Sequence, residues 1–165
     1  MNEHAVGIDV SKRTLDVCVS RGEKFKTKVV KNTPSGHRLL LGWLAERQLP
    51  ADTPIVLEAT GPYSEAVAIA LVDAGWRVSI INPARVKGFA QSELVRNKTD
   101  AADAKLLARF AQRSELALWE PPSPAERELR ALIERLRALQ EMRQQERTHP
   151  GGPRAGRAIQ SRGDG

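Results

Sequence analysis

Residues 5–10 read AVGIDV, an apolar run that a single acid, Asp9, interrupts. Such a run is typical of a short buried β-strand. An acid inside it loses hydration, which is unfavourable unless a positive group lies nearby. Because side chains alternate along a strand, Ile8 and Val10 point to one face and Asp9 to the other. The stretch PIVLE, residues 54–58, likewise ends an apolar run on Glu58. We expect this second strand to lie beside the first and both acids to gather at the carboxyl edge of the sheet.

The surrounding segments predict an α/β domain. Three strands joined by short turns predict an antiparallel meander over residues 4–10, 14–20 and 25–30, the third at an edge because one of its faces is polar. Helices and strands then alternate, with the strand at 55–59 apolar throughout and therefore central and parallel. The expected elements are a helix at 37–48, a strand at 55–59, a helix from Thr60-Gly61-Pro62 to Ala74, a strand at 76–81, a helix at 83–90, a polar loop at 91–98 and a helix at 100–113 capped by Thr99. This order predicts a ribonuclease-H-like mixed five-stranded sheet with helices on both faces.

The carboxy-terminal third has a different composition. Ser123 and Glu126 form a capping box at the start of a helix. Leucines follow at 3-4-3 spacing, which predicts a coiled-coil seam that needs a partner because the helix is short; they are Leu129, Leu132, Leu136 and Leu139. Residues 148–165 lack apolar periodicity, which predicts disorder. We therefore expect a catalytic domain at 1–118, a linker and coiled-coil helix at 119–147 and a disordered tail at 148–165.

Composition restricts the class of protein. The 165 residues carry a net charge of +6 and a sequence pI near 9.9, which favours a polyanionic partner. Cys18 is the single cysteine, so an intrachain disulfide and a cysteine-rich metal site are excluded. The apolar runs are too short for a membrane span and no signal peptide is recognisable, so we expect a cytoplasmic protein.

Asp100 and Asp103 open the last helix of the domain three residues apart, so they share one helix face. Together with Asp9 and Glu58 they favour a site for two magnesium or manganese ions, with Asp9 as the bridging ligand, Glu58 on one ion and the helix pair on the other. Three alternatives stay open: Asp9 caps the following turn, Glu58 pairs with a lysine, an arginine or a helix N-terminus, and the helix aspartates stabilise the helix dipole.

Other residues near the expected site receive weaker interpretations. Lys12, Arg13 and Lys98 flank the acids and are candidates for contacts with a phosphate backbone, or are ordinary solvated surface. Tyr63 is a candidate for stacking on a base or orienting a phosphate, and the alternative is an aromatic side chain that packs in the core. We expect Asp16, on the second strand, to face away from the site or into solvent.

Four ordered motifs extend this interpretation: GIDVSK at 7–12, LEATGPY at 57–63, INP at 81–83 and KTDAADA at 98–104. Together they resemble the DEDD transposases of bacterial insertion sequences, a group that includes the pilin-gene invertases and the bridge-RNA-guided recombinases. The resemblance implies a RuvC-like amino-terminal domain, magnesium, DNA recombination, a structured guide RNA in many members and multimeric assembly. It also implies Asp9, Glu58, Asp100 and Asp103 as the catalytic tetrad.

The chain departs from that family after the leucine-rich helix, where the serine-bearing carboxy-terminal domain is expected. We therefore expect an isolated metal-binding half of a transposase, a truncated copy. One alternative is a non-catalytic nucleic-acid-binding regulator that dimerises through residues 124–147. Another is a phosphotransferase of the actin and sugar-kinase type, which needs glycines where Ser11, Lys12 and Arg13 stand.

Overall fold

The computed structural model describes residues 2–59, 61–92 and 100–148, the last range without the side chains of residues 100–102 and 146–148. The chain divides into two units, Met1–Pro121 and Pro122–Gly165, each considered by itself. The elements of the first unit are β1 (His4–Val10), β2 (Thr14–Arg21), β3 (Lys24–Lys31), α1 (Pro34–Ala45), β4 (Pro54–Glu58), η1 (Gly61–Tyr63), α2 (Glu65–Asp73), β5 (Arg77–Ile81), α3 (Pro83–Ser92) and α4 (Asp100–Arg113).

The strands form a five-stranded sheet in the order β3-β2-β1-β4-β5. The meander β1-β2-β3 is antiparallel, whereas β4 runs parallel to both β1 and β5. This arrangement confirms the predicted ribonuclease-H-like mixed sheet with β3 at an edge and β4 inside it. The three central residues of β4 are fully buried because both faces of this strand are covered.

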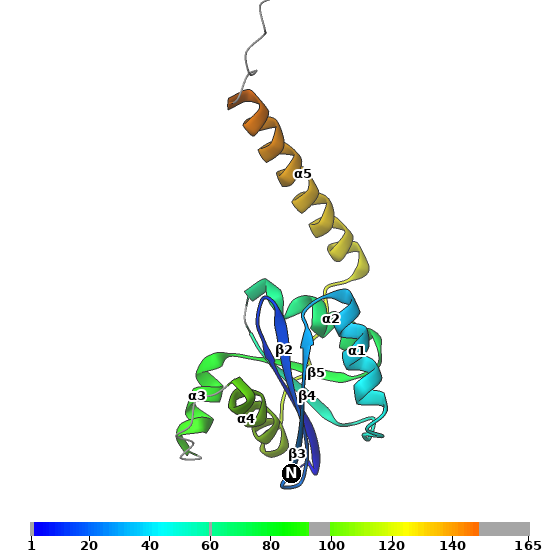
Figure 1. Cartoon of the computed structure of the whole chain (residues 1–165), viewed down its shortest axis with the longest axis vertical. Coiled ribbons are helices and arrows are strands. Elements are labelled where there is room, and N and C mark those ends of the chain that lie inside the picture. Colours follow the sequence, from blue (N-terminus) through cyan, green and yellow to red (C-terminus); the bar gives the residue numbers. More distant parts are fainter. Residues whose placement is uncertain (1, 60, 93–99, 149–165) are drawn as a thin grey trace, which may run out of the picture. The chain divides into compact units, whose positions relative to one another are not determined.

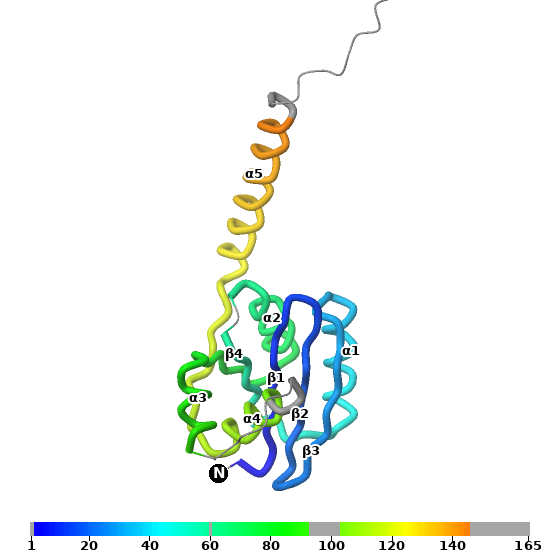
Figure 2. Tube along the Cα trace, turned by 60° about the vertical axis from the view of Figure 1, so that its left-hand side comes forward, coloured from blue at the N-terminus to red at the C-terminus, as the bar shows by residue number. Residues whose placement is uncertain are grey.

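Helices cover both faces of the sheet. Figure 1 shows α1 and α2 on one side and α3 and α4 on the other, and Figure 2 shows β4, β1, β2 and β3 side by side in the sheet. On the first side Ile8 and Leu57 pack with Leu40 and Leu44 of α1 in the larger core cluster. Full burial of such a side chain stabilises the fold by ~1.5–3 kcal/mol relative to exposure. On the second side Val56 of β4 packs with Leu107 and Phe110 of α4.

Gly7 brings α4 close to β1. A Cβ atom at Gly7 would lie 2.2 Å from the Ala104 carbonyl oxygen and 2.4 Å from the Ala108 nitrogen. Farther along the helix, the Gln112 carbonyl accepts a 2.9 Å hydrogen bond from the backbone N–H of Asn2. The carboxyl end of α4 therefore lies at the amino end of β1, so the two elements run antiparallel, and the first turn of α4 points toward the carboxyl end of β1.

Two helix starts differ from the prediction. α1 begins at Pro34, three residues earlier than expected, because Thr33 caps it by accepting a 3.2 Å hydrogen bond from the Gly36 N–H. The helix expected from Thr60-Gly61-Pro62 is a short 3₁₀ turn, η1, followed by α2 from Glu65, because Gly61 adopts φ +65° and breaks the helical path. The expected caps Thr60 and Thr99, and most of the loop predicted at 91–98, lie outside the described residues.

The described part of the second unit contains α5 (Pro124–Thr148). The predicted capping box is confirmed: Ser123 Oγ accepts from the Glu126 N–H at 3.2 Å, and Glu126 Oε2 accepts from the Ser123 N–H at 2.7 Å. These hydrogen bonds lower the pKa of Glu126. The four leucines of the predicted seam are 54–58% exposed, and the coiled coil stays a prediction. Beyond Thr148 the predicted disordered tail lies outside the described residues, and none of the described helices is long and apolar enough to cross a bilayer.

Candidate metal centre

Asp9 and Glu58 occupy the same edge and the same face of the sheet. Ile8 pairs with Leu57 in the parallel register of β1 and β4, so the next residue of each strand is one of the two acids. Gly7 and Val56 face α4, and a strand returns to the same face every second residue. Both carboxylates, each half-buried, therefore lie on the α4 side at the carboxyl ends of their strands.

Asp103 of α4 lies close enough to Glu58 for its charge to act there. Burial raises the pKa of Glu58 above its ordinary value, and the negative charge of Asp103 raises it further. Lys87 of α3 opposes this by lowering the same pKa. The register of α4 explains the approach: Ala104 lies over Gly7, and Asp9 is two strand residues, ~6.6 Å, farther along β1. A helix covers that distance in ~4 residues, which leads to its first turn.

Asp100 is the first residue of α4, and its side chain lies outside the described part of the structure. Among the side chains that are described, no three acidic, histidine or cysteine residues stand together as ligands for one metal ion. The structure thus brings Asp9 and Glu58 to one edge and places Asp103 near Glu58, without assembling a described three-ligand cluster. The predicted four-acid site remains a prediction.

Asp16 was expected to face away from the site or into solvent, and the first of these alternatives is wrong. It pairs directly with Asp9 in the antiparallel register of β1 and β2, and opposed residues of such a pair share a face. Cys18, two residues farther along β2, packs against Ala104 and Ala108 of α4, which confirms the face. Asp16 is half-buried, so a further acid lies beside the candidate site. Pairing register, which a single strand does not reveal, decides this position.

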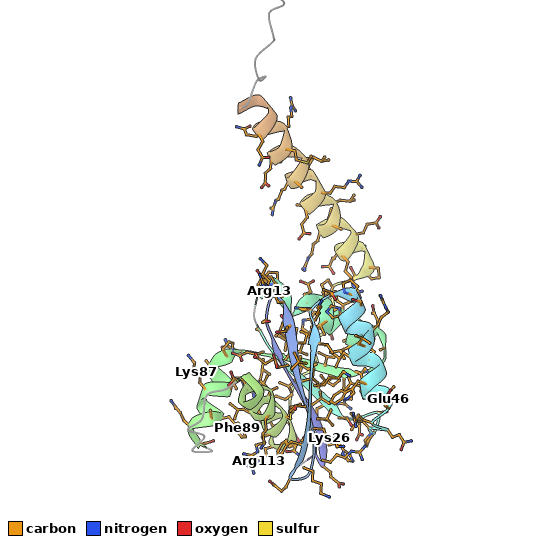
Figure 3. The ribbon with its side chains drawn as sticks, viewed as in Figure 1. Arg13, Lys26, Glu46, Lys87, Phe89 and Arg113 are labelled. Atoms are coloured by element: carbon orange, nitrogen blue, oxygen red, sulfur yellow. The ribbon has the colours of Figure 1, made fainter. Side chains whose placement is uncertain are left out.

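The positive side chains around the acids differ in part from those expected. Lys12 and Arg13 are exposed in the turn after β1, and Figure 3 shows Arg13 at that end of the sheet. Lys98 lies outside the described residues. Lys87 was not among the expected cations, and its charge lowers the pKa of Glu58. The position of α3 directly after β5, the strand that pairs with β4, was the feature of the sequence that pointed to Lys87.

A hydrogen-bonded group built on Asn32 supports the loops beyond the two acid-bearing strands. Asn32 Nδ2 donates to the Ser11 carbonyl at 2.9 Å and to the Tyr63 carbonyl at 3.1 Å. His37 Nε2 lies 2.8 Å from Asn32 Oδ1 and must donate, because an amide oxygen only accepts. Burial lowers the pKa of His37, which favours the neutral imidazole with its proton on Nε2. Asn32 therefore ties the turn after β1 to η1, a role that neither residue's sequence context indicated.

Two alternatives for individual residues can be assessed. The first alternative is that Asp9 caps the turn after β1. Ser11 Oγ accepts hydrogen bonds from the backbone N–H groups of Arg13 and Thr14 at 3.3 and 2.9 Å, so this turn already has a capping side chain. Tyr63 is 41% exposed, which excludes the core-aromatic alternative for its ring. Burial raises the pKa of Cys18 to about 11, so its thiol is protonated at neutral pH.

The chain is similar in sequence to known proteins. A model of the DEDD transposases of the IS110 type, described as a transposase, matches residues 6–149. The pilin gene-inverting proteins of Moraxella bovis and Moraxella lacunata are each 34% identical to the chain over 134 residues, which is 81% of the chain and 42% of each relative. The chain thus spans about two fifths of the length of these relatives.

Solved structures give a weaker likeness. T. thermophilus RuvC in complex with a Holliday junction substrate is 19% identical with a TM-score of 0.48, over 65% of this chain and 90% of that one. A second Thermus thermophilus RuvC structure is also 19% identical with a TM-score of 0.48, over 70% of this chain and 99% of that one.

Proposed function

The chain belongs to the DEDD transposase family, and from that membership we propose that its first unit performs metal-dependent DNA strand cleavage during transposition. The observation that carries the proposal is the raised pKa of the half-buried Glu58. A half-buried carboxylate whose pKa is raised by burial and by a second acid gains from any cation that enters between them. The negative charge of a glutamate with a purely structural role is normally compensated by a paired arginine or lysine. Lys87 compensates the charge of Glu58 only in part, because the pKa of Glu58 is still raised.

Four residues would hold the metal: Asp9 from β1, Glu58 from β4, and Asp100 and Asp103 from the first turn of α4. Carboxylate oxygens suit magnesium or manganese, and the described residues offer no cysteine or histidine cluster that favours zinc. When bound, two such ions activate the attacking oxygen and stabilise the leaving oxygen of a phosphodiester. Asp9 is on β1, between β2 and β4 in the sheet, and would be the ligand shared by both ions.

DNA is the proposed substrate. Lys12 and Arg13 stand exposed at the same end of the sheet as the acids, where they would hold the phosphate backbone by charge. Asn32 fixes the turn that carries them through its bond to the Ser11 carbonyl. A guide RNA and a multimer are additional partners implied by the family resemblance.

Metal binding tests the proposal directly. Titration calorimetry of the full chain with Mn²⁺ should give a binding isotherm that Asp9→Asn abolishes and that Asp52→Asn leaves unchanged. Asp52 is a matched control because it is an exposed acid that precedes the amino end of β4. Circular dichroism should show that both variants keep the fold. An unchanged isotherm for Asp9→Asn refutes the metal site, and nicking of supercoiled DNA with Mg²⁺ then measures the activity itself.

A second candidate, a nucleic-acid-binding regulator that dimerises, is favoured by the leucine face of α5. Leu129, Leu132 and Leu136 are 56–58% exposed, so α5 carries apolar surface that a partner helix would cover. Such a regulator binds DNA in EDTA as well as it does in Mg²⁺ and cuts none. The metal titration therefore separates the two candidates.

A further inference from the structure

A second charged site lies away from the acids. It is a hollow of about 370 Å³ beside the end of α1, with four basic side chains and one acid among its lining residues. The lining residues are Val19, Arg21, Lys24, Lys26, Glu46, Arg47 and Gln48. An excess of three positive charges (four minus one) around one hollow is unfavourable unless an anion enters it.

The hollow is remote from the candidate metal centre in two respects. Arg21 pairs with His4, the first residue of β1, whereas Asp9 is near the last, five residues or ~16 Å along the strand. Lys26 pairs with Val19, whose side chain packs in the core cluster of α1, so this face is opposite to the one that carries the acids. Figure 3 shows Lys26 and Glu46 at the end of the domain away from Arg13.

Specific contacts hold the two arginines in the lining. The guanidinium of Arg21 donates to the Arg47 carbonyl, just beyond the end of α1. The guanidinium of Arg47 lies 4.5 Å from the ring centre of Trp43, and its Nε is buried without an acceptor among the described residues. Stacking on a ring and bonding to a carbonyl restrict both side chains, so they cannot simply separate to relieve their repulsion.

The lysines add an extended element. Lys24 and Lys26 are exposed, lie on one face of β3, and repeat every ~6.6 Å along the strand. Lys28 continues the row toward Trp43, 6.0 Å from its ring centre. A compact anion would need one cluster of charges, whereas a hollow with a row of cations leading from it suits a chain of phosphates.

We propose that this hollow and the β3 lysines bind the phosphate backbone of a nucleic acid, at a site separate from the metal centre. The proposal rests on the nucleic-acid partner of the proposed function but not on its metal chemistry. A nucleic acid held here lies on the other face of the sheet from the acids, so this site anchors a segment that is not the one being cut. The contacts are to phosphates, so binding here is independent of base sequence.

Edge strands also carry lysines to prevent pairing with other chains, and the two roles differ in what they predict. Protection against aggregation needs charge only on the strand and leaves the salt dependence of nucleic-acid binding unchanged. Phosphate contacts are lost one by one as cations are removed, and each loss reduces the slope of log K against log salt by ~0.9 for a duplex.

Binding of a fluorescein-labelled 30-base-pair duplex to the full chain in EDTA tests the proposal, with separate DNA and RNA arms to identify the backbone that is bound. Lys24→Gln/Lys26→Gln should weaken binding up to ~60-fold at 0.1 M salt in at least one arm, because each contact contributes a factor of ~8 there, and should reduce the slope by ~1.8. Lys24→Arg/Lys26→Arg should restore both values.

Arg77→Gln/Arg85→Gln is the matched control, since it removes the same charge from β5 and α3 at the other side of the sheet. It should change the slope by much less. Equal effects of the two double variants in both arms, or a Gln variant that aggregates while its slope is unchanged, overturn the proposal. Because EDTA removes metal, a failure of the metal centre leaves this result intact, and a failure here leaves the Mn²⁺ titration intact.

Discussion

Replacement of Gly7 by alanine tests the contact that brings α4 to the acid-bearing strands. The new Cβ would lie 2.2 Å from the Ala104 carbonyl oxygen, and contacts below 3.0 Å essentially never occur, so the helix must retreat by at least 0.8 Å (3.0 minus 2.2). The Ala108 nitrogen and the Leu107 Cβ, at 2.4 and 2.7 Å, block the other directions. Overpacking of this kind costs ~1–3 kcal/mol, and the backbone clash favours the upper end, ~3 kcal/mol. At ~4 °C per kcal/mol for a unit of this size, Tm should fall by ~12 °C.

Thermal unfolding followed by circular dichroism measures this change, and Gly42→Ala is its matched control. Gly42 lies in α1 with open space around the added Cβ, and alanine is a better helix former than glycine by up to ~1 kcal/mol. The same substitution should therefore raise Tm by ~4 °C at Gly42. In addition, Gly7→Ala should weaken Mn²⁺ binding because α4 carries Asp103 away from Glu58. An unchanged Tm for Gly7→Ala would show that α4 does not pack on β1 as described.

Three further predictions concern the acids and α5. Because the pKa of Glu58 is raised in the fold, the folded state holds the proton more tightly, and the free energy of unfolding falls as pH rises above 4.5. Glu58→Gln should therefore raise Tm at pH 7 in EDTA, and this gain should be lost below pH 4.5. An equal gain in Tm at both pH values contradicts this prediction. Ser123→Ala should reduce the helical circular dichroism signal of α5 because the Glu126 N–H loses its acceptor, whereas no loss of signal would mean that the cap is dispensable. Leu132→Glu should weaken self-association in sedimentation, and a wild-type chain that is already monomeric would rule out the seam.

The sequence by itself determined which side chains of a strand share a face. Alternation in AVGIDV placed Ile8 and Val10 on one face and Asp9 on the other, and the structure agrees because Ile8 and Val10 pack in the larger cluster with α1 while Asp9 lies on the α4 side. The order of elements, the edge position of β3 and the capping box of Ser123 were also predictable, because each depends on residues only a few positions apart. The four motifs likewise indicated the family without any structure.

Only the tertiary structure decided which acids and cations become neighbours. Asp16 lies opposite Asp9 because of the pairing register between β1 and β2, and the alternation within β2 alone leaves that register open. Lys87 acts on Glu58 because α3, which follows β5, packs against α4. The basic hollow exists because Arg47, just beyond α1, meets Arg21 of β2. Local periodicity sets the direction of a side chain from its own segment. Its neighbours depend on how closely segments distant in the chain approach, as at Gly7, where a missing side chain lets α4 approach the sheet.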